Sequence, residues 1–178
     1  MRAIVTGATG FVGQNIVNEL LKNSIEVIAI DVNVEHVPSE WNEHVTCVKL
    51  NLFDESQYHI LDQYEADMAF HLAWAATSGN MRGNVSLQLD NARYACSFME
   101  YLAQRGCKRF VFAGSIMEYE AMEYIIHDDS KPSLGMIYST AKLTADFMLK
   151  TLANSLELEY VMYLFQIFME REKNLRVF

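Results

Sequence analysis

The amino-acid sequence predicts an α/β fold in which a doubly wound parallel sheet carries helices on both faces. Two observations lead to this prediction. Short apolar runs alternate along the 178-residue chain with segments of helical period, as they do in successive β-α-β units. The first run ends in three glycines, Gly7, Gly10 and Gly13, and an amphipathic segment follows directly. Strand, glycine turn and helix in that order are the context of a dinucleotide-phosphate site.

Length and composition describe one globular domain, which we place at residues 1–178. The chain is long enough to bury a core, and 51% of its residues are hydrophobic against 21% charged, a balance typical of folded proteins. The net charge is −9 and no basic run is present, which argues against nucleic acid or an anionic membrane surface as a partner. The longest strongly apolar stretch, residues 160–169, is too short to cross a bilayer.

The cysteines and histidines predict neither disulfides nor a metal site. Cys47, Cys96 and Cys107 are odd in number and form no Cys-x-x-Cys pair, so we expect free thiols in a reducing compartment. The five histidines lack metal-ligand spacing. The chain opens on a strand rather than a secretory signal. The expected location is therefore the cytoplasm.

The alternating pattern also predicts the order of the elements. Apolar, β-branched runs indicate strands at roughly 2–6, 25–31, 45–50, 67–72, 108–114 and 158–165. Segments of helical period indicate helices at roughly 11–23, 54–64, 84–105 and 136–155. Ligands of open parallel sheets bind at the carboxyl ends of the strands. The residues that follow each strand are therefore the candidates for a site.

The turn after the first strand predicts a phosphate site. Gly7 lets the chain turn tightly, Gly10 lets the backbone approach a pyrophosphate, and Gly13 lets the new helix pack closely on its strand. The helix N-terminus then offers N–H groups and a partial positive charge to the phosphates. An ordinary glycine-rich turn has the same spacing, so the prediction depends on the residues that follow.

The ends of the second and third strands predict an adenosine site. Asp31 lies 18 residues after Gly13, where a carboxylate can accept both ribose hydroxyls and would repel a 2′-phosphate. This favours NAD over NADP, although a solvated strand-end aspartate is the alternative. After the third strand, Asn51 and Leu52 could hold an adenine ring between a polar and an apolar group. Asp54 in the same stretch is also a good helix cap.

The fourth strand brings His71 and Trp74 to the same edge. His71 is flanked by apolar residues, and we interpret it as a core histidine. Small residues at Ala73, Ala75 and Ala76 would leave room for a cofactor. Trp74 is either part of the core or a wall of the nicotinamide pocket, and the sequence leaves both alternatives open.

The catalytic candidates come from the fifth strand and the last helix. Ser115 places a hydroxyl at the carboxyl end of its strand, and Tyr138 and Lys142 are four residues apart, on one face of a helix. A free phenol has a pKa of about 10 and is a poor base at neutral pH. A cation about 4 Å away would lower the pKa of Tyr138 toward the range in which general acid–base catalysis is efficient.

Taken together, these residues resemble the extended short-chain dehydrogenase/reductase family, in its NAD-dependent nucleotide-sugar epimerase/dehydratase branch. The matching pieces run in order over about residues 1–165. They are Thr6–Gly13, Asp31, Asn51–Leu52, His71–Ala73, Asn91, Lys108–Phe112, Ser115, Tyr119, and the Tyr138/Lys142 pair.

The resemblance implies a Rossmann-type sheet that binds NAD and a nucleotide-sugar substrate. Tyr138 would be the proton donor and acceptor, Lys142 would hold the nicotinamide ribose and tune Tyr138, and Ser115 would bind the reacting sugar oxygen. The residues implied for cofactor binding are Gly7, Thr9, Gly10, Phe11, Val12, Gly13, Asp31, Asn51, Leu52, Leu72, Ala73, Trp74, Asn91, Ala113, Tyr138 and Lys142. The family's dimers imply a homodimer through the helices near 84–105 and 136–155.

The chain also departs from the family pattern. Trp74 replaces the usual small residue, and Ile116 and Met117 replace the Asp-Glu pair with which the 4,6-dehydratases eliminate water. This favours epimerisation or ketone reduction over dehydration. Residues 163–170 lack the family's Arg and Asn-x-Tyr-Gly-Pro groups, and family chains continue for more than a hundred residues that build most of the sugar-nucleotide pocket. We therefore expect a NAD-binding Rossmann domain with that C-terminal substrate domain largely absent.

Two functions follow as hypotheses. The first is an NAD-dependent epimerase or oxidoreductase that acts on a nucleotide-linked sugar. The second is a dinucleotide-binding module without turnover, either a redox sensor or an inactive truncated relative. A flavin or quinone reductase on a similar sheet fits Asp31 and the Tyr138/Lys142 pair less well.

Overall fold

The computed structural model describes residues 1–35, 37–41, 44–127 and 129–165 of the chain. A six-stranded parallel sheet lies at its centre, with the strand order β3-β2-β1-β4-β5-β6. The strands are β1 (Arg2–Thr6), β2 (Glu26–Asp31), β3 (Val45–Lys49), β4 (Met68–His71), β5 (Arg109–Ser115) and β6 (Glu159–Phe165). The order reverses between β1 and β4, which opens a crevice at their carboxyl ends. The predicted doubly wound parallel sheet is confirmed.

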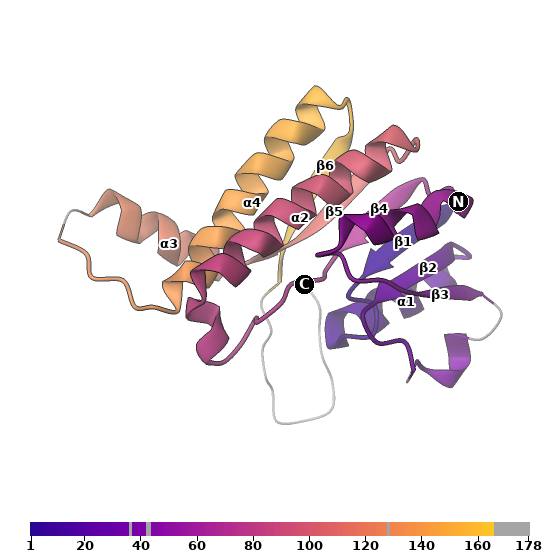
Figure 1. The fold of residues 1–178 in the computed structure, drawn as a ribbon, viewed down its shortest axis with the longest axis horizontal. Coiled ribbons are helices and arrows are strands. Elements are labelled where there is room, and N and C mark those ends of the chain that lie inside the picture. The colour runs from indigo at the N-terminus through magenta and orange to yellow at the C-terminus, as the bar shows by residue number, and fades with distance from the viewer. Residues whose placement is uncertain (36, 42–43, 128, 166–178) are drawn as a thin grey trace.

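Helices cover both faces of this sheet. Helix α1 (Phe11–Lys22) packs on one face, and α2 (Val85–Gln104) and α4 (Met136–Ser155) lie side by side on the other (Figure 1). The remaining helical elements are η1 (Ser39–Trp41), η2 (Glu55–Gln63), η3 (Asn80–Gly83) and α3 (Met117–Ile126). Among the described residues, no helix combines the length and the apolar character that a membrane span needs.

The core has two layers because the strands are buried on both faces. Ile4 of β1 and Phe110 of β5 pack with α2 and α4. The neighbouring Val5 points to the other face and packs with Val17 of α1 and with Trp41 of η1. Continuous apolar strands of this kind belong to parallel sheets covered on both sides, which is why the apolar runs could be identified from the sequence.

Two segments differ from the sequence-based expectation. Residues expected as an α-helix at 54–64 form the 3₁₀ helix η2 instead, in which Tyr58 and Leu61, three residues apart, are buried on one face. Helix α3 was not expected. Its Met122, Ile125 and Ile126 are exposed, so its apolar residues show no single buried face that would indicate a helix.

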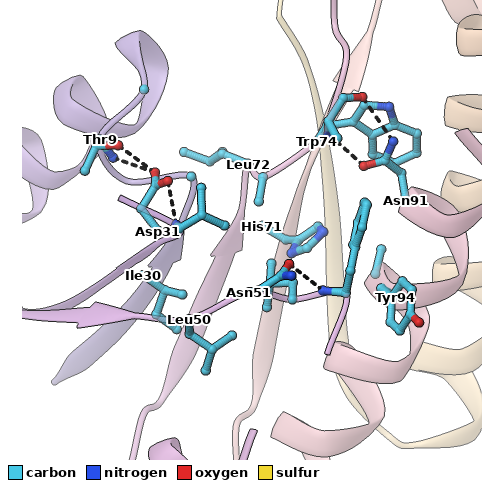
Figure 2. A pocket seen from close by; sticks show the side chains of 18 residues that line it. Thr9, Ile30, Asp31, Leu50, Asn51, His71, Leu72, Trp74, Asn91 and Tyr94 are labelled. Atoms are coloured by element: carbon cyan, nitrogen blue, oxygen red, sulfur yellow. Dashed lines mark hydrogen bonds between the residues drawn. The ribbon is translucent and has the colours of Figure 1, made fainter. Parts of the chain in front are cut away.

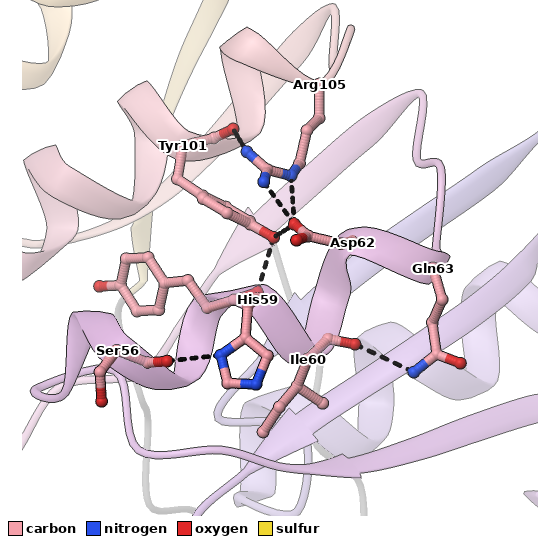
Figure 3. Close-up of polar contacts among 8 residues, drawn as sticks. Ser56, His59, Ile60, Asp62, Gln63, Tyr101 and Arg105 are labelled. Atoms are coloured by element: carbon pink, nitrogen blue, oxygen red, sulfur yellow. Dashed lines mark hydrogen bonds and ion pairs between the residues drawn. The ribbon is translucent and has the colours of Figure 1, made fainter.

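A polar cluster joins η2 to the C-terminal half of α2 (Figure 3). The Tyr101 hydroxyl lies 2.6 Å from the Tyr58 carbonyl oxygen and 2.7 Å from the Asp62 carboxylate. Arg105 Nε donates to the same carboxylate at 2.8 Å. The hydrogen bond from Tyr101, followed by that from Arg105, lowers the pKa of Asp62. The first half of α2 carries several residues of the site described next.

Candidate functional site

The turn from β1 into α1 brings backbone to the edge of the sheet. Gly7 has a φ of +66°, and a Cβ there would lie 2.9 Å from the backbone nitrogen of Ala73, so only glycine fits both the turn and the close approach of the segment that follows β4. A Cβ at Gly13 would lie 2.7 Å from the Cα of Ala8, so α1 starts in direct contact with the turn. Gly10 is the N-cap of α1 and supplies no side chain, which leaves the N–H groups of the first turn without a side-chain cap.

Thr9 and Asp31 join this turn to the end of β2. One Asp31 oxygen accepts hydrogen bonds from the Thr9 N–H at 3.1 Å and the Thr9 hydroxyl at 2.8 Å (Figure 2). The other accepts from the Val32 N–H at 2.8 Å. The carboxylate is thereby held in one orientation, and the oxygen that accepts only the Val32 N–H keeps lone-pair capacity for a further donor such as a ribose hydroxyl.

A cavity of about 400 Å³ runs along the carboxyl ends of β1 to β4, a volume within the range of small-molecule sites. Figure 2 shows Thr9 and Asp31 at one end of it and Trp74 and Asn91 at the other. Of the residues expected to bind a cofactor, it is lined by Gly7, Thr9, Gly10, Asp31, Asn51, Leu52, Leu72, Ala73, Trp74 and Asn91. The expected residues outside its lining are Phe11, Val12, Gly13, Ala113, Tyr138 and Lys142, together with Ser115.

Part of the cavity lining is apolar and was not expected from the sequence. Ile30, Leu50, Phe53 and Tyr94 also face the cavity, and the rings of Phe53 and Tyr94 stack with their centroids 5.2 Å apart. Tyr94 follows Asn91 by three residues on α2, and this helical spacing puts both on one face. The spacing from Asn91 was the available signal for Tyr94.

His71 is buried at the end of β4, as the sequence predicts. Its Nδ1 lies 3.1 Å from the Thr6 hydroxyl oxygen, and its ring stacks on Phe110 with centroids 5.6 Å apart. Burial, with a smaller contribution from the charge of Lys142, lowers the pKa of His71 to about 3. His71 is therefore neutral at physiological pH and presents an uncharged ring to the cavity.

Two side chains of α2 hold the segment that follows β4. Asn91 accepts a hydrogen bond from the Ala75 N–H at 2.7 Å and donates to the Ala75 carbonyl at 3.1 Å. Gln88, almost one turn earlier, accepts the indole N–H of Trp74 at 2.7 Å. Gln88 was not selected from the sequence. Together the two amides fix both the backbone and the indole at this end of the cavity.

The three catalytic candidates lie together behind Trp74. Ser115 lies close enough to Tyr138 to lower the pKa of the phenol, and the rings of Trp74 and Tyr138 pack edge to face with centroids 6.3 Å apart. Lys142 Nζ lies 3.9 Å from the centre of the Trp74 ring and donates to the Ala113 carbonyl at 2.7 Å. Trp74 touches the cavity on one side and these residues on the other.

The expected lowering of the Tyr138 pKa by Lys142 is wrong for this structure. Burial raises the pKa of Tyr138, and the neighbouring Ser115 side chain offsets this rise only in part. Lys142 is 3% exposed, and burial lowers its own pKa to about 7. The reason is desolvation, which disfavours the phenolate and the ammonium alike.

Two charged residues that the sequence did not single out lie next to Tyr138. The guanidinium carbon of Arg82 is 4.5 Å from the centre of the Tyr138 ring, and its charge lowers the Tyr138 pKa. Glu118 is buried, and its Oε1 accepts the Ser115 N–H at 2.6 Å. Its Oε2 has no hydrogen-bond partner among the described residues. Burial raises the pKa of Glu118.

Comparisons with known proteins find a matching family model and two similar curated proteins. The model of the NAD dependent epimerase/dehydratase family matches residues 3–169. The chain is 30% identical over 119 residues to a dTDP-6-deoxy-L-talose 4-dehydrogenase (NAD(+)) of Aggregatibacter actinomycetemcomitans, covering 66% of this chain and 43% of that protein. It is 23% identical over 120 residues to a dTDP-4-dehydro-6-deoxyglucose reductase of Escherichia coli, covering 63% and 38%. The chain thus spans less than half the length of these curated relatives.

Solved structures share the fold. The UDP-glucose 4-epimerase of Thermus thermophilus in complex with NAD superposes with a TM-score of 0.71 at 20% identity, over 91% of this chain and 54% of that one.

Proposed function

The chain belongs to the NAD-dependent epimerase/dehydratase family, and from this premise we propose that it is an NAD-dependent epimerase or oxidoreductase acting on a nucleotide-linked sugar. One observation carries the proposal. A single cavity runs from Asp31 to Trp74, and Trp74 touches both Tyr138 and Lys142. The cofactor of the family is NAD, which supplies reversible hydride transfer when bound.

The residues along the cavity fit the adenosine diphosphate part of this cofactor. Asp31 would accept the ribose hydroxyls, and the Gly10 backbone would meet the pyrophosphate at the start of α1. A Cβ at Gly10 would meet only the Gly7 carbonyl oxygen, at 3.2 Å, so the space beside Gly10 is otherwise open. The ring pair of Phe53 and Tyr94 offers an apolar surface to adenine.

The remaining roles fall to the three residues behind Trp74. Tyr138 would exchange the hydroxyl proton of the sugar, Ser115 would hydrogen-bond the reacting oxygen, and Lys142 would hold the nicotinamide ribose. Because burial raises its pKa, Tyr138 carries its proton at neutral pH and is prepared to donate it to a sugar ketone. Ile116 and Met117 offer no acid–base group for elimination of water, so we propose epimerisation or ketone reduction rather than dehydration.

The relatives suggest where on the sugar the reaction takes place. The names of the talose dehydrogenase, the 4-dehydro-6-deoxyglucose reductase and the UDP-glucose epimerase all specify position 4 of a nucleotide-linked hexose. We propose the same carbon for this chain, with a nucleoside diphosphate as the carrier of the sugar.

The test is a turnover assay on a panel of UDP- and dTDP-linked hexoses and their 4-keto forms. NADH absorbance detects net redox change and NMR detects epimers, which leave the absorbance unchanged. Tyr138→Phe should lower the rate by about a hundredfold or more. Tyr124→Phe, on α3 and outside the cavity lining, is the matched control and should not. Equal rates for the wild type and Tyr138→Phe would contradict the proposed role.

One observation favours a second function, a dinucleotide-binding module without turnover. Lys142 is enclosed by the Ala113 carbonyl and the faces of Trp74 and Phe112, so it does not reach the cavity. Cofactor binding without turnover of any sugar nucleotide in the panel would support this function.

We also propose a homodimer in the cytoplasm. Helices α2 and α4 expose apolar side chains, among them Leu89 and Phe147, and the resemblance to the family points to these helices. Light scattering should give twice the chain mass, and Phe147→Asp should give the monomer.

The proposed cytoplasmic location rests on the cysteines. The free thiols Cys47, Cys96 and Cys107 suit a reducing compartment.

A further inference from the structure

The indole of Trp74 ends the cavity on the side of the catalytic candidates. Its N–H donates to Gln88, the Lys142 ammonium lies over its face, and the Tyr138 ring packs against it at nearly a right angle. The cavity lining includes Trp74 but not Ser115, Tyr138 or Lys142. The indole therefore lies between the cavity and the side chains of Tyr138 and Lys142.

The surroundings distinguish Trp74 from an ordinary core tryptophan. Trp41, the other tryptophan, is 1% exposed, whereas Trp74 is partly exposed and lines a cavity. The backbone beside Trp74 is fixed, because Asn91 bonds both polar groups of Ala75. The indole makes one hydrogen bond, to Gln88, and its other contacts are with the Lys142 ammonium and the rings of Tyr138 and Phe112. A rotation about the side-chain bonds of Trp74 would open the path while the backbone stayed in place.

We propose that Trp74 is a gate, and that with the gate closed the cavity accepts adenosine diphosphate but not the nicotinamide riboside half of NAD. The gate rests on the proposed function, because it concerns the same cavity. Binding of the complete dinucleotide then requires the indole to leave Lys142 and Tyr138. A ligand that binds only a minor conformation loses apparent affinity by the fraction of that conformation. Trp74 therefore lowers the affinity for NAD without affecting ADP.

The test compares ADP and NAD+ by calorimetry on the wild type, Trp74→Ala and Trp74→Phe. We expect the wild type to bind NAD+ no more tightly than ADP. Trp74→Ala should tighten NAD+ by about tenfold or more and change ADP by less than about twofold. Trp74→Phe keeps a smaller ring at this position and should show a smaller gain in NAD+ affinity. Trp41→Phe is the matched control and should leave the ratio of the two affinities unchanged.

Several outcomes would overturn the gate. Trp74 is only a packing residue if its variants change both affinities equally or leave the NAD+ affinity unchanged. The same holds if the wild type already binds NAD+ at least about tenfold more tightly than ADP. Failure of the proposed function gives results that differ from these. Either neither ADP nor NAD+ binds any variant, or both nucleotides bind and no sugar nucleotide is turned over. If neither ligand binds, the gate fails as well.

Discussion

The two ends of the cavity are built in different ways. The end at Asp31 is made largely of backbone: the left-handed Gly7, the uncapped start of α1, and a carboxylate held by its own neighbours. The end at Trp74 is made of large side chains packed on one another, with Lys142 and Tyr138 buried behind the indole. The first end is open to a ligand as it stands. The second must rearrange before it can work.

The difference shows how binding and chemistry can be separated within one fold. A phosphate needs only N–H groups and the absence of a side chain, and both come from chain geometry. Proton transfer needs a phenol and an ammonium with suitable pKa values, and these depend on every neighbour that excludes water. Ligand binding at the Asp31 end is therefore expected to stay unchanged when side chains at the Trp74 end are substituted.

The largest expected effect on stability at a fixed pH lies at the backbone-built end. In Gly13→Ala the new Cβ would lie 2.7 Å from the Cα of Ala8, which is backbone and cannot move cheaply. Overpacking costs about 1–3 kcal/mol or more, so we expect a loss of about 3 kcal/mol in the free energy of unfolding, measured by urea denaturation. Gly10→Ala is the matched control, with a cost below about 1 kcal/mol but weakened ADP binding. Equal losses in the two variants would contradict this difference in packing.

The next effect is on the pH dependence of stability, at the side-chain-built end. Burial lowers the pKa of Lys142 to about 7, whereas in the unfolded chain its pKa is about 10.4. Between these values the unfolded state binds more protons, so the free energy of unfolding rises with pH by up to about 1.4 kcal/mol per unit.

Lys142→Met removes this contribution and should flatten the rise between pH 7 and 10, measured by urea denaturation at several pH values. Lys150→Met, at an exposed position on the same helix, should leave the rise as it is in the wild type. The same slope in all three proteins would show that Lys142 keeps its proton in the fold.

The two ends also differ in how far the sequence could predict them. Gly7, Asp31 and the alternation of strands and helices follow from spacing and local geometry, so the doubly wound parallel sheet and the lining near Asp31 were predictable. The pKa of Tyr138 was not, because it depends on burial and on Arg82 and Glu118, which are remote from it in sequence. Helix spacing correctly indicated one face for Tyr138 and Lys142, but not that Trp74 would cover it.

A smaller effect concerns the choice between cofactors. If the Asp31 carboxylate repels a 2′-phosphate, the wild type should bind NADH more tightly than NADPH. Asp31→Asn keeps the shape and an acceptor for Thr9 but removes the charge, and should narrow the preference by about tenfold. Fluorescence titration with both nucleotides measures it. Trp74→Phe should leave the preference unchanged, because it alters only the other end. A preference that moves with Trp74 would show that the two ends are coupled.

The smallest expected effect distinguishes Arg82 from Lys142 as the cation that acts on Tyr138. The Arg82 charge lowers the Tyr138 pKa, and sugar oxidation needs the phenolate. Arg82→Met should therefore shift the rising limb of the pH profile of kcat/KM to higher pH. At pH values below the Tyr138 pKa, kcat/KM should fall by no more than about fivefold in Arg82→Met, since partly exposed charges contribute up to about 1 kcal/mol. Arg93, whose guanidinium carbon lies 4.9 Å from the centre of the Tyr94 ring, provides the matched control at the adenosine end. Arg93→Met should leave the limb in place, and a limb unmoved by Arg82→Met would mean that burial and Ser115 alone set the proton affinity of Tyr138.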